Sequence, residues 1–381
     1  MRPENPPMQP DLRLTRRRFL QCTAAGVAAA CLPRRLPAAG NQAPGEFRRG
    51  GMVYRPLGRT GLNVSLLGFG SHTDRAYKVK GGLRNLLTAE GQVRRDRQIS
   101  RAIDLGVNLI DVYEHEGQWE PLAKLIKPRR DRLLIAGAYD NPEFIGSNID
   151  RLARLYGGHI DLYRIRSETI TFDSGSLIEQ WDVVRRAKEA GKIRAIGIAC
   201  HLEGPMMSAL QELDGLDYLF LPYNFIHAKA AYGELLPAAA ARGVGLIGMK
   251  PLAAGSVVGL DPRSQSKSGP DMARFQLFNS ADRAILPAAV AELAKTLRQL
   301  PDESLCQAAM RYAFSRPFLS SVLAGMFDDQ FVEENYTAVT RYAELSREET
   351  AALEAAKRVS FLTGPDWLPG HYQWLDAQWR V

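Results

Sequence analysis

The sequence has few cysteines, and none is spaced as a metal ligand. Only four occur in 381 residues, at positions 22, 31, 200 and 306. They form no Cys-x-x-Cys pair and no Cys/His ligand pattern, so zinc and iron–sulfur sites are not expected. Two lie in the first fifty residues. The sequence does not decide whether the other two, Cys200 and Cys306, pair with each other.

The sequence also lacks a hydrophobic run of membrane-spanning length near its N-terminus. The Ala-rich stretch Cys22–Leu32 is shorter than the roughly 20 residues that a spanning helix needs, and it contains Gly26. Hydrophobic residues make up 45% of the chain and charged residues 24%, which are ordinary values for a globular protein. We therefore expect a folded body without a transmembrane segment.

Most of the chain carries little excess positive charge. The formal net charge is +7, but residues 1–50 hold nine Arg against three acidic residues, which leaves about +1 for the remaining 331 residues. The basic excess thus belongs to the N-terminal segment and not to a binding face. Nucleic acid is not an expected partner.

The N-terminal segment has the pattern of an export signal. The run Thr15-Arg16-Arg17-Arg18-Phe19-Leu20-Gln21 precedes the Ala-rich stretch and resembles the twin-arginine signal, Ser/Thr-Arg-Arg-x-Phe-Leu. The resemblance implies the twin-arginine export machinery as a partner and a periplasmic or otherwise exported location. Because that route carries folded proteins, a cofactor is expected to bind before export.

The processing of this segment stays open between three alternatives. Pro37-Ala38-Ala39 offers a small-residue cleavage site, whereas Ala28-Ala29-Ala30-Cys31 resembles a weak lipobox, which would make Cys31 a lipid anchor. The third alternative is an arginine-rich disordered tail. Residues 33–52, rich in Pro, Gly and Arg, are predicted to be a linker. We place the signal and linker at 1–50 and one folded domain at 51–381.

In the body of the chain, short apolar runs alternate with longer amphipathic stretches, a pattern typical of a parallel sheet wrapped by helices. Helical periodicity covers 98–104, 144–155 and 177–190. The predicted strands are 65–70, 108–113, 133–138, 160–165, 193–199, 218–223, 245–249 and 321–325, and Gly106, Gly191 and Gly243 stand where helices should end. Eight strands predict a closed (β/α)8 TIM barrel of the α/β class.

A doubly wound open sheet is the alternative architecture. It would require a Gly-rich phosphate turn after an early strand. Gly68-Phe69-Gly70 does not fit this turn, because the third glycine of the motif would fall on Thr73.

Tyr54–Ser65, continuing into Leu67–Gly70, resembles the opening hairpin of bacterial aldo/keto reductases. Similar signatures follow in order at 102–111, 160–163, 191–197, 222–224 and 250–255. The resemblance extends over about 53–340. It implies a TIM barrel with its active site at the carboxyl ends of the strands. It also implies hydride transfer between a nicotinamide dinucleotide and a carbonyl.

In that family Tyr protonates the carbonyl oxygen, Lys with support from Asp lowers the pKa of the Tyr, and His orients the substrate. The resemblance aligns Asp111 with the family Asp. It aligns Glu116 with the Tyr, Ala138 with the Lys and Arg166 with the His. Three of the four roles have therefore changed.

The match to the family differs between the residues expected to bind the two halves of the cofactor. Ala199, Cys200 and Phe220 replace the family residues that hold the nicotinamide carboxamide. Gly325, at the end of the eighth strand, and the pair Glu334-Asn335, which resembles the adenine-contacting Glu-Asn, are retained.

The choice between NAD and NADP depends on residues just before Glu334-Asn335. Phe331 stands where a 2′-phosphate-binding Arg is expected, and Asp328 and Asp329 add negative charge nearby. NAD is therefore predicted over NADP. Complete loss of the cofactor is the alternative.

Titratable and polar side chains gather at the predicted strand ends, and barrel chemistry is concentrated there. From these we predict Asp111, His115, Glu116 and Arg166 as catalytic residues and Tyr223, Lys250, Gly325, Glu334 and Asn335 as cofactor-binding residues, with no metal.

Several of these residues have competing interpretations. His115 is a candidate acid–base in place of Tyr, or an ordinary loop histidine. Arg166 binds a carboxylate or phosphate, or pairs with Asp111 or Glu116. Lys250 faces a pyrophosphate or is an exposed rim charge.

Two further segments bear on the substrate. Residues 256–281 occupy the place of a family flap, and the tail 364–381 is rich in aromatic residues. The tail either closes over a ring-shaped substrate or seals the barrel exterior.

The sequence thus predicts an exported, NAD-linked oxidoreductase that acts on a small carbonyl or sugar-like molecule. The alternative is a non-redox barrel, lyase-like or ligand-binding, that has lost the cofactor. A structural or partner-binding protein is a third alternative, which would need a large exposed apolar patch, a feature that a sequence cannot display.

Overall fold

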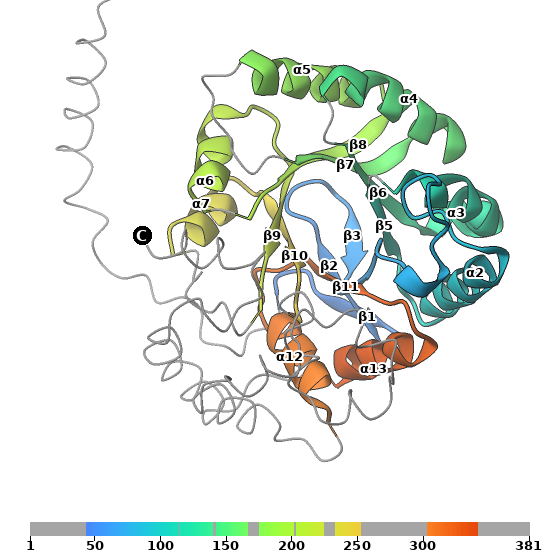
Figure 1. Ribbon diagram of the computed structural model, residues 1–381. Coiled ribbons are helices and arrows are strands. Elements are labelled where there is room, and N and C mark those ends of the chain that lie inside the picture. The colour runs from blue at the N-terminus through green and yellow to red at the C-terminus, as the bar shows by residue number, and fades with distance from the viewer. Residues whose placement is uncertain are drawn as a thin grey trace, which may run out of the picture. The chain divides into compact units, whose positions relative to one another are not determined.

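The computed structural model describes residues 43–113, 115–139, 142–166, 175–201, 203–224, 233–252 and 303–341. Eight parallel strands close into a barrel in the order β10-β11-β4-β5-β6-β7-β8-β9 (Figure 1). The strands are β4 (Leu67–Gly70), β5 (Leu109–Tyr113), β6 (Leu134–Tyr139), β7 (Ile160–Arg166), β8 (Ile193–Ala199), β9 (Tyr218–Pro222), β10 (Gly245–Met249) and β11 (Ser321–Gly325). Since β11 pairs with both β10 and β4, the sheet has no edge and the predicted TIM barrel is confirmed.

Helices surround the barrel on its outside (Figure 1). They are α2 (Ala89–Asp104), α3 (Trp119–Ile126), α4 (Ile145–Leu155), α5 (Gly175–Glu189), α6 (Glu203–Glu212), α7 (Leu235–Ala241), α12 (Leu305–Phe314) and α13 (Asp329–Thr340). The three predicted helices correspond to parts of α2, α4 and α5. Gly106, Gly191 and Gly243 all have positive φ, at 97°, 75° and 65°, and each follows a helix as predicted.

Local sequence determines where several helices begin. The Thr88 hydroxyl caps α2 by accepting from the Gly91 amide at 3.2 Å. Ser304 and Gln307 form a reciprocal capping box at the start of α12. The Asp328 carboxylate caps α13 through the Gln330 amide at 2.9 Å.

A separate antiparallel sheet closes the end of the barrel where the strands begin (Figure 1). It consists of β1 (Phe47–Arg49), β2 (Met52–Pro56) and β3 (Asn63–Ser65), so the predicted opening hairpin is present. Strand β1 lies inside the segment that we predicted to be a linker. The Arg55 guanidinium bonds to the Glu46 carboxylate at 2.7 Å and to three carbonyls near the end of α12. The folded body therefore includes residues before position 51.

Two apolar layers hold the barrel together. Larger side chains pack between the strands and the outer helices. Inside the barrel, Ala136, Ala195 and Ala199 are small and leave room for Tyr218 and Phe220. Leu57, Leu62 and Val64 of the closing sheet complete this inner layer, so it is a packed core rather than a pore.

Some predicted features lie outside the described ranges, namely the export signal with Cys31, the flap 256–281 and the tail 364–381. Cys200 and Cys306 are both buried, and they form no disulfide with each other. Within the described ranges, no helix combines the length and the apolar composition needed to cross a bilayer.

Candidate functional site

A buried ion pair lies at the centre of the barrel mouth. Asp111 on β5 accepts two hydrogen bonds from the Arg164 guanidinium on β7, at 2.9 and 3.0 Å, and both side chains are buried. The Arg164 pKa is raised, because the contact with Asp111 outweighs the opposing effect of burial. Such a bidentate pair fixes both side chains in one geometry.

Arg164 reaches the position that the family resemblance assigns to Lys. The register pairs Ala138 on β6 with Arg164 on β7, so the two residues stand at the same level of the barrel. Ala138 is fully buried and has no charged group of its own. The Arg164 guanidinium also lies 4.2 Å from the centre of the Phe220 ring. A cation from β7, the next strand but one after β5, thus stands beside the carboxylate.

The backbone next to Asp111 is strained. Tyr113 has φ of +43°, a conformation that side chains other than Gly rarely adopt, and the strand register shifts between Asp111 and Tyr113. The Asp111 carboxylate accepts from the Tyr113 amide at 3.3 Å, and the Trp119 indole donates to the Tyr113 carbonyl at 3.2 Å. A bulge of this kind redirects a side chain at a strand end.

The redirected Tyr113 side chain lies among arginines. Its hydroxyl accepts a hydrogen bond from the Arg166 guanidinium at 2.8 Å. The guanidinium carbons of Arg164 and Arg84 lie 5.4 and 5.7 Å from the centre of its ring. The arginine bonded to both oxygens of Asp111 is Arg164, whereas Arg166 donates to the Tyr113 hydroxyl.

His115 is buried behind Tyr113. Its Nδ1 lies 3.0 Å from the Ser71 carbonyl, which requires the proton on Nδ1 and leaves Nε2 as an acceptor. Burial, with a smaller contribution from the nearby His72, lowers the pKa of His115 to about 3. The ring packs edge-on against Tyr113 at 5.2 Å. A neutral imidazole in this place suits positioning of Tyr113 better than proton transfer at neutral pH.

Glu116 is half-buried in a short 3-10 helix, Glu116–Gln118, and its carboxylate lies beside a second tyrosine, Tyr139, at the end of β6. Burial raises the pKa of Tyr139, and the charge of Glu116 and a hydrogen bond to it raise it further. The two tyrosines at the mouth thus differ, with a cation beside Tyr113 and an anion beside Tyr139.

The predicted cofactor residues of β9 and β10 are placed by local contacts. Lys250 has φ of +56° and its ammonium donates to His201 Nε2 at 2.6 Å, while its carbonyl accepts from the Asn224 amide at 3.1 Å. The Tyr223 ring stacks on Tyr312 at 5.8 Å and therefore packs in the outer layer, toward α12.

Gly325 and α13 form the distal part of the site. A Cβ on Gly325 would meet only the Phe327 ring, at 3.5 Å, so the end of β11 is open. Asn335 lies on the buried side of α13, and no residue in the described ranges hydrogen-bonds its side-chain amide. The Glu334 carboxylate accepts from Gln330 on the same helix.

The acidic residues at the start of α13 face arginines of α2. Asp329 pairs with Arg97, and an Asp328 oxygen lies 3.8 Å from Arg94. The negative charge that we expected to repel a 2′-phosphate is therefore compensated. Of the three residues, only Phe331 then disfavours NADP.

Sequence reasoning missed two residues of the mouth, Arg164 and Tyr113. The signal for Arg164 was a charged residue within the apolar strand Ile160–Arg166. The signal for Tyr113 was weaker, because its side-chain direction depends on the bulge.

Comparison with known proteins agrees with this architecture. Residues 88–358 match the family model described as aldo/keto reductase family. L-galactose dehydrogenase of Arabidopsis thaliana is 27% identical over 338 residues, covering 81% of this chain and 97% of that protein. Protein tas of Escherichia coli K12 is 25% identical over 368 residues, covering 82% of this chain and 100% of that protein.

Solved structures show the same fold. An aldo-keto reductase from Bacillus halodurans, in its apo form, matches with a TM-score of 0.59 at 20% identity and covers 79% of this chain and 95% of that chain. Its holo form gives the same values. Since the family match extends over more than half of the sequence, the chain belongs to the aldo/keto reductase family of oxidoreductases.

Proposed function

We propose that the protein interconverts a carbonyl and an alcohol with a nicotinamide cofactor, and that Tyr113 is its proton donor. The observation that carries the proposal is the Tyr113 hydroxyl, 2.8 Å from the Arg166 guanidinium and beside the buried pair of Asp111 and Arg164. Members of the family use nicotinamide cofactors, which supply or take up hydride when bound.

The described residues fit the adenosine half of such a cofactor better than the nicotinamide half. On α13, Asn335 presents an amide without a protein partner in the described ranges, and Gly325 leaves the end of β11 open. Lys250 places a positive charge at the end of β10, where a phosphate would be stabilised. By contrast, Ala199 and Phe220 offer no amide to a carboxamide.

The proton follows from the groups around Tyr113. Reduction of a carbonyl places a hydride on carbon and a proton on oxygen, and Tyr113 gives the proton to that oxygen. The hydroxyl accepts its bond from Arg166, so it does not use its own proton in that contact. The guanidinium groups of Arg166 and Arg164 stabilise the phenolate that forms on Tyr113. The phenolate then regains a proton from solvent. Asp111 holds Arg164 in place.

The alternatives at the mouth are weaker acids in this setting. Tyr139 lies beside the Glu116 carboxylate, which opposes formation of a second negative charge. His115 is neutral at ordinary pH and holds its Nδ1 proton toward the Ser71 carbonyl. The strain at Tyr113 also supports a functional role, because strained residues concentrate at active sites.

The experiment compares Tyr113→Phe with Tyr139→Phe, which each remove one hydroxyl. We expect Tyr113→Phe to lower kcat by about 100-fold or more, and Tyr139→Phe to change it by less than about fivefold. Arg166→Met should move the pH profile of kcat to higher pH. Full activity of Tyr113→Phe would contradict the assignment.

We infer NAD as the preferred dinucleotide, although the family more often uses NADPH. Phe331, on the first turn of α13, has no group that could pair with a 2′-phosphate. The proposed substrate is a small carbonyl or sugar-like molecule. One relative carries the name L-galactose dehydrogenase, which supports a sugar. The aromatic tail is consistent with this class, and truncation at Gly364 should weaken substrate binding if the tail covers a ring.

We also propose export through the twin-arginine route, supported by Thr15–Gln21 in the sequence. Replacing Arg16 and Arg17 by Lys should retain the protein in the cytoplasm, as judged by cell fractionation. Cys31→Ser separates the two processing routes, because only a lipoprotein would leave the membrane fraction as a result. Unchanged fractionation of the Arg16→Lys/Arg17→Lys protein would contradict export by this route.

A further inference from the structure

Three buried polar side chains point into the barrel from alternate strands. They are Asp111 on β5, Arg164 on β7 and Tyr218 on β9, and they are 6%, 1% and 0% exposed, which keeps all three from bulk water. In a barrel of this kind, alternate strands supply the side chains of one inner layer. Asp111 and Arg164 are bonded to each other, whereas Tyr218 packs in the inner apolar layer. The Tyr218 hydroxyl is thus the third polar group of this interior.

The strand register directs the tip of Tyr218 toward Arg164. Arg164 is aligned with Gly197 on β8, and Gly197 is aligned with Tyr218 on β9. Because Gly197 has no side chain, the Tyr218 ring covers it. A Cβ at Gly197 would lie 2.6 Å from Tyr218 Cζ, the ring carbon that carries the hydroxyl. The ring therefore reaches across β8 toward β7, the strand of Arg164.

Two polar atoms of this layer have no hydrogen-bond partner in the described part of the chain, namely Tyr218 Oη and Arg164 Nε. The Nε–H is a donor and the hydroxyl oxygen an acceptor, so each can satisfy the other. A buried ion pair is most stable when its remaining protons are also bonded. Burial raises the pKa of Tyr218, although the charge of Arg164 opposes that rise, so the hydroxyl stays neutral.

We propose that Tyr218 is a positioning residue of the reaction, whose hydroxyl accepts from Arg164 Nε and keeps the guanidinium directed at Tyr113. The inference rests on the proposed function, in which Arg164, 5.4 Å from the centre of the Tyr113 ring, stabilises the phenolate. Asp111 holds the two terminal nitrogens, and the Phe220 ring lies 4.2 Å from the guanidinium carbon. Tyr218 holds the third nitrogen.

A hydroxyl suits this place better than a second carboxylate. Asp111 already balances the charge of Arg164. Another anion beside the guanidinium would oppose the negative charge that develops on Tyr113, whereas a neutral acceptor orients the cation without cancelling its field.

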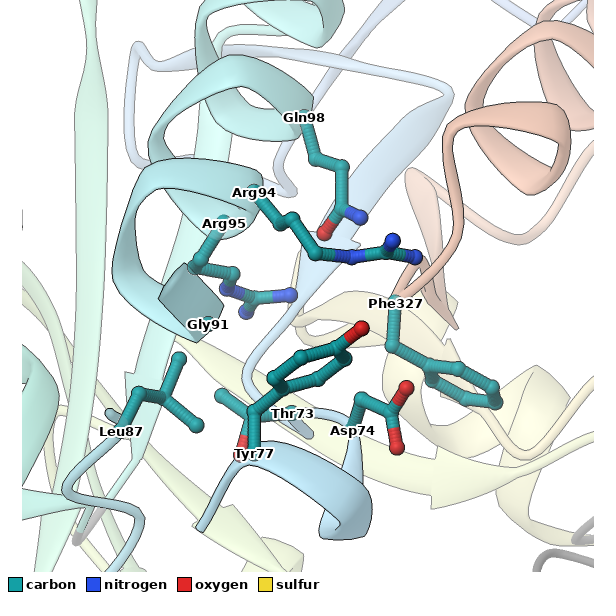
Figure 2. A pocket seen from close by; sticks show the side chains of 9 residues that line it. All are labelled: Thr73, Asp74, Tyr77, Leu87, Gly91, Arg94, Arg95, Gln98 and Phe327. Carbon is teal, nitrogen blue, oxygen red and sulfur yellow. The ribbon is translucent and has the colours of Figure 1, made fainter. Parts of the chain in front are cut away.

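A second buried guanidinium shows that an unpaired Nε does not identify such a position by itself. Arg95 Nε also lacks a partner in the described ranges, and this side chain lies in a small pocket between α2 and the loops after β4 and β11 (Figure 2). Its terminal nitrogens donate to three backbone carbonyls of those loops. Arg95 therefore ties loops together, whereas Arg164 stands beside the proposed proton donor.

The test compares Tyr218→Phe with Tyr163→Phe, which removes a buried hydroxyl from the outer face of β7. We expect Tyr218→Phe to lower kcat about threefold to tenfold at unchanged KM, the loss of one hydrogen bond. The pH profile of kcat should move about half a unit higher, because the Tyr113 phenolate is stabilised less. The Tyr163 hydroxyl bonds to Asn148 at 2.8 Å, so Tyr163→Phe should lower Tm and leave the profile in place.

A double-mutant cycle assigns the effect to Arg164. Arg164→Lys keeps the cation and removes the Nε–H, so Tyr218→Phe should change kcat little in that background. Beside Arg166→Met it should keep its full effect, since Arg166 bonds to Tyr113 directly. Equal effects in the two backgrounds would show that Tyr218 does not act through Arg164.

A measurement that does not depend on the reaction separates this inference from the proposed function. In protein labelled with 15N-arginine, the Arg164 Nε–H signal, identified by its loss in Arg164→Lys, should be protected from solvent exchange and should shift in Tyr218→Phe. An unshifted signal, or an unmoved pH profile when Tyr113→Phe is inactive, would overturn the role of Tyr218. Full activity of Tyr113→Phe would instead overturn the proposed function on which this role rests.

Discussion

The mouth of the barrel and the face between α2 and α13 hold their charges in different ways. At the mouth, Asp111 and Arg164 are buried and bonded at two points. Between the helices, Arg97 pairs with Asp329 and Arg101 with Glu333, and all four side chains are about half exposed. Water screens the second set and not the first, so one buried pair should matter more for stability than two exposed pairs.

The barrel mouth and α13 also differ in which of the residues expected from the family resemblance they retain. The helix that carries Glu334 and Asn335 keeps the residues that the resemblance assigns to adenine. At the mouth, Asp111 on β5, which the resemblance aligns with the family Asp, is bonded to Arg164 on β7, the next strand but one.

The largest expected effect on stability comes from breaking the buried pair. Arg164→Met leaves the Asp111 carboxylate buried and unpaired, which should cost about 3–5 kcal/mol of unfolding free energy. The double variant Asp111→Leu/Arg164→Met should regain most of that loss. Urea unfolding of the two proteins measures both values.

The exposed pair supplies the matched control for this comparison. Arg101→Met removes the contact with Glu333 and should lower the free energy of unfolding far less than Arg164→Met, because this pair is exposed to solvent. If Arg164→Met were as mild as Arg101→Met, the distinction between the buried and the exposed pair would be wrong.

The next largest effect is a dependence of the free energy of unfolding on pH, which arises from His115. The folded-state pKa of about 3 lies below the ordinary 6.5, so the unfolded chain takes up a proton that the folded chain does not. Stability should therefore fall as the pH drops from 6.5 toward 3, by about 2 kcal/mol at pH 5. His115→Asn keeps a donor for the Ser71 carbonyl and should remove this part of the slope in urea titrations at pH 7 and pH 5. A slope that persists in the variant would assign it to other groups.

A smaller effect is expected on α13. Asn335→Ala removes an amide that would contact the adenine and should weaken NAD binding about five- to tenfold, the loss of one hydrogen bond. Because Asn335 is remote from Tyr113, kcat should change little. A loss of kcat at unchanged NAD affinity, measured by calorimetry and steady-state kinetics, would contradict this division between binding and chemistry.

The smallest expected change is in dinucleotide preference. Phe331→Arg places a guanidinium where a 2′-phosphate would lie, and should improve NADP binding about fivefold relative to NAD. The Asp328 and Asp329 charges are compensated by α2, so they should not cancel the gain. Parallel titrations of the two dinucleotides give the ratio, and an unchanged ratio would place the 2′ position elsewhere.

The barrel could be predicted from sequence because its determinants are local. Apolar runs of strand length and glycines at helix ends repeat along the chain, and Gly106, Gly191 and Gly243 occupy the left-handed conformation that this position favours. Asp111 could also be placed, because it ends a strand that the resemblance covers.

The partners at the site could not be predicted in the same way. Which arginine meets Asp111 depends on the register of β5, β6 and β7, which sets the level of each side chain in the barrel. The direction of Tyr113 depends on a bulge, and a one-residue shift reverses the side of the strand to which a side chain points. The periodicity of a single segment predicts neither the partner of Asp111 nor the direction of the Tyr113 side chain.

The central claim is that this barrel uses a nicotinamide cofactor. The most direct measurement is mass spectrometry of small molecules released from the protein folded in its own cytoplasm, followed by titration of the stripped protein with NAD and NADP. We expect that NAD is released or binds clearly, more tightly than NADP, and that Asn335→Ala weakens NAD binding. The absence of both released nucleotide and binding would contradict the claim and direct the search toward non-redox chemistry at Asp111, Tyr113 and Arg166.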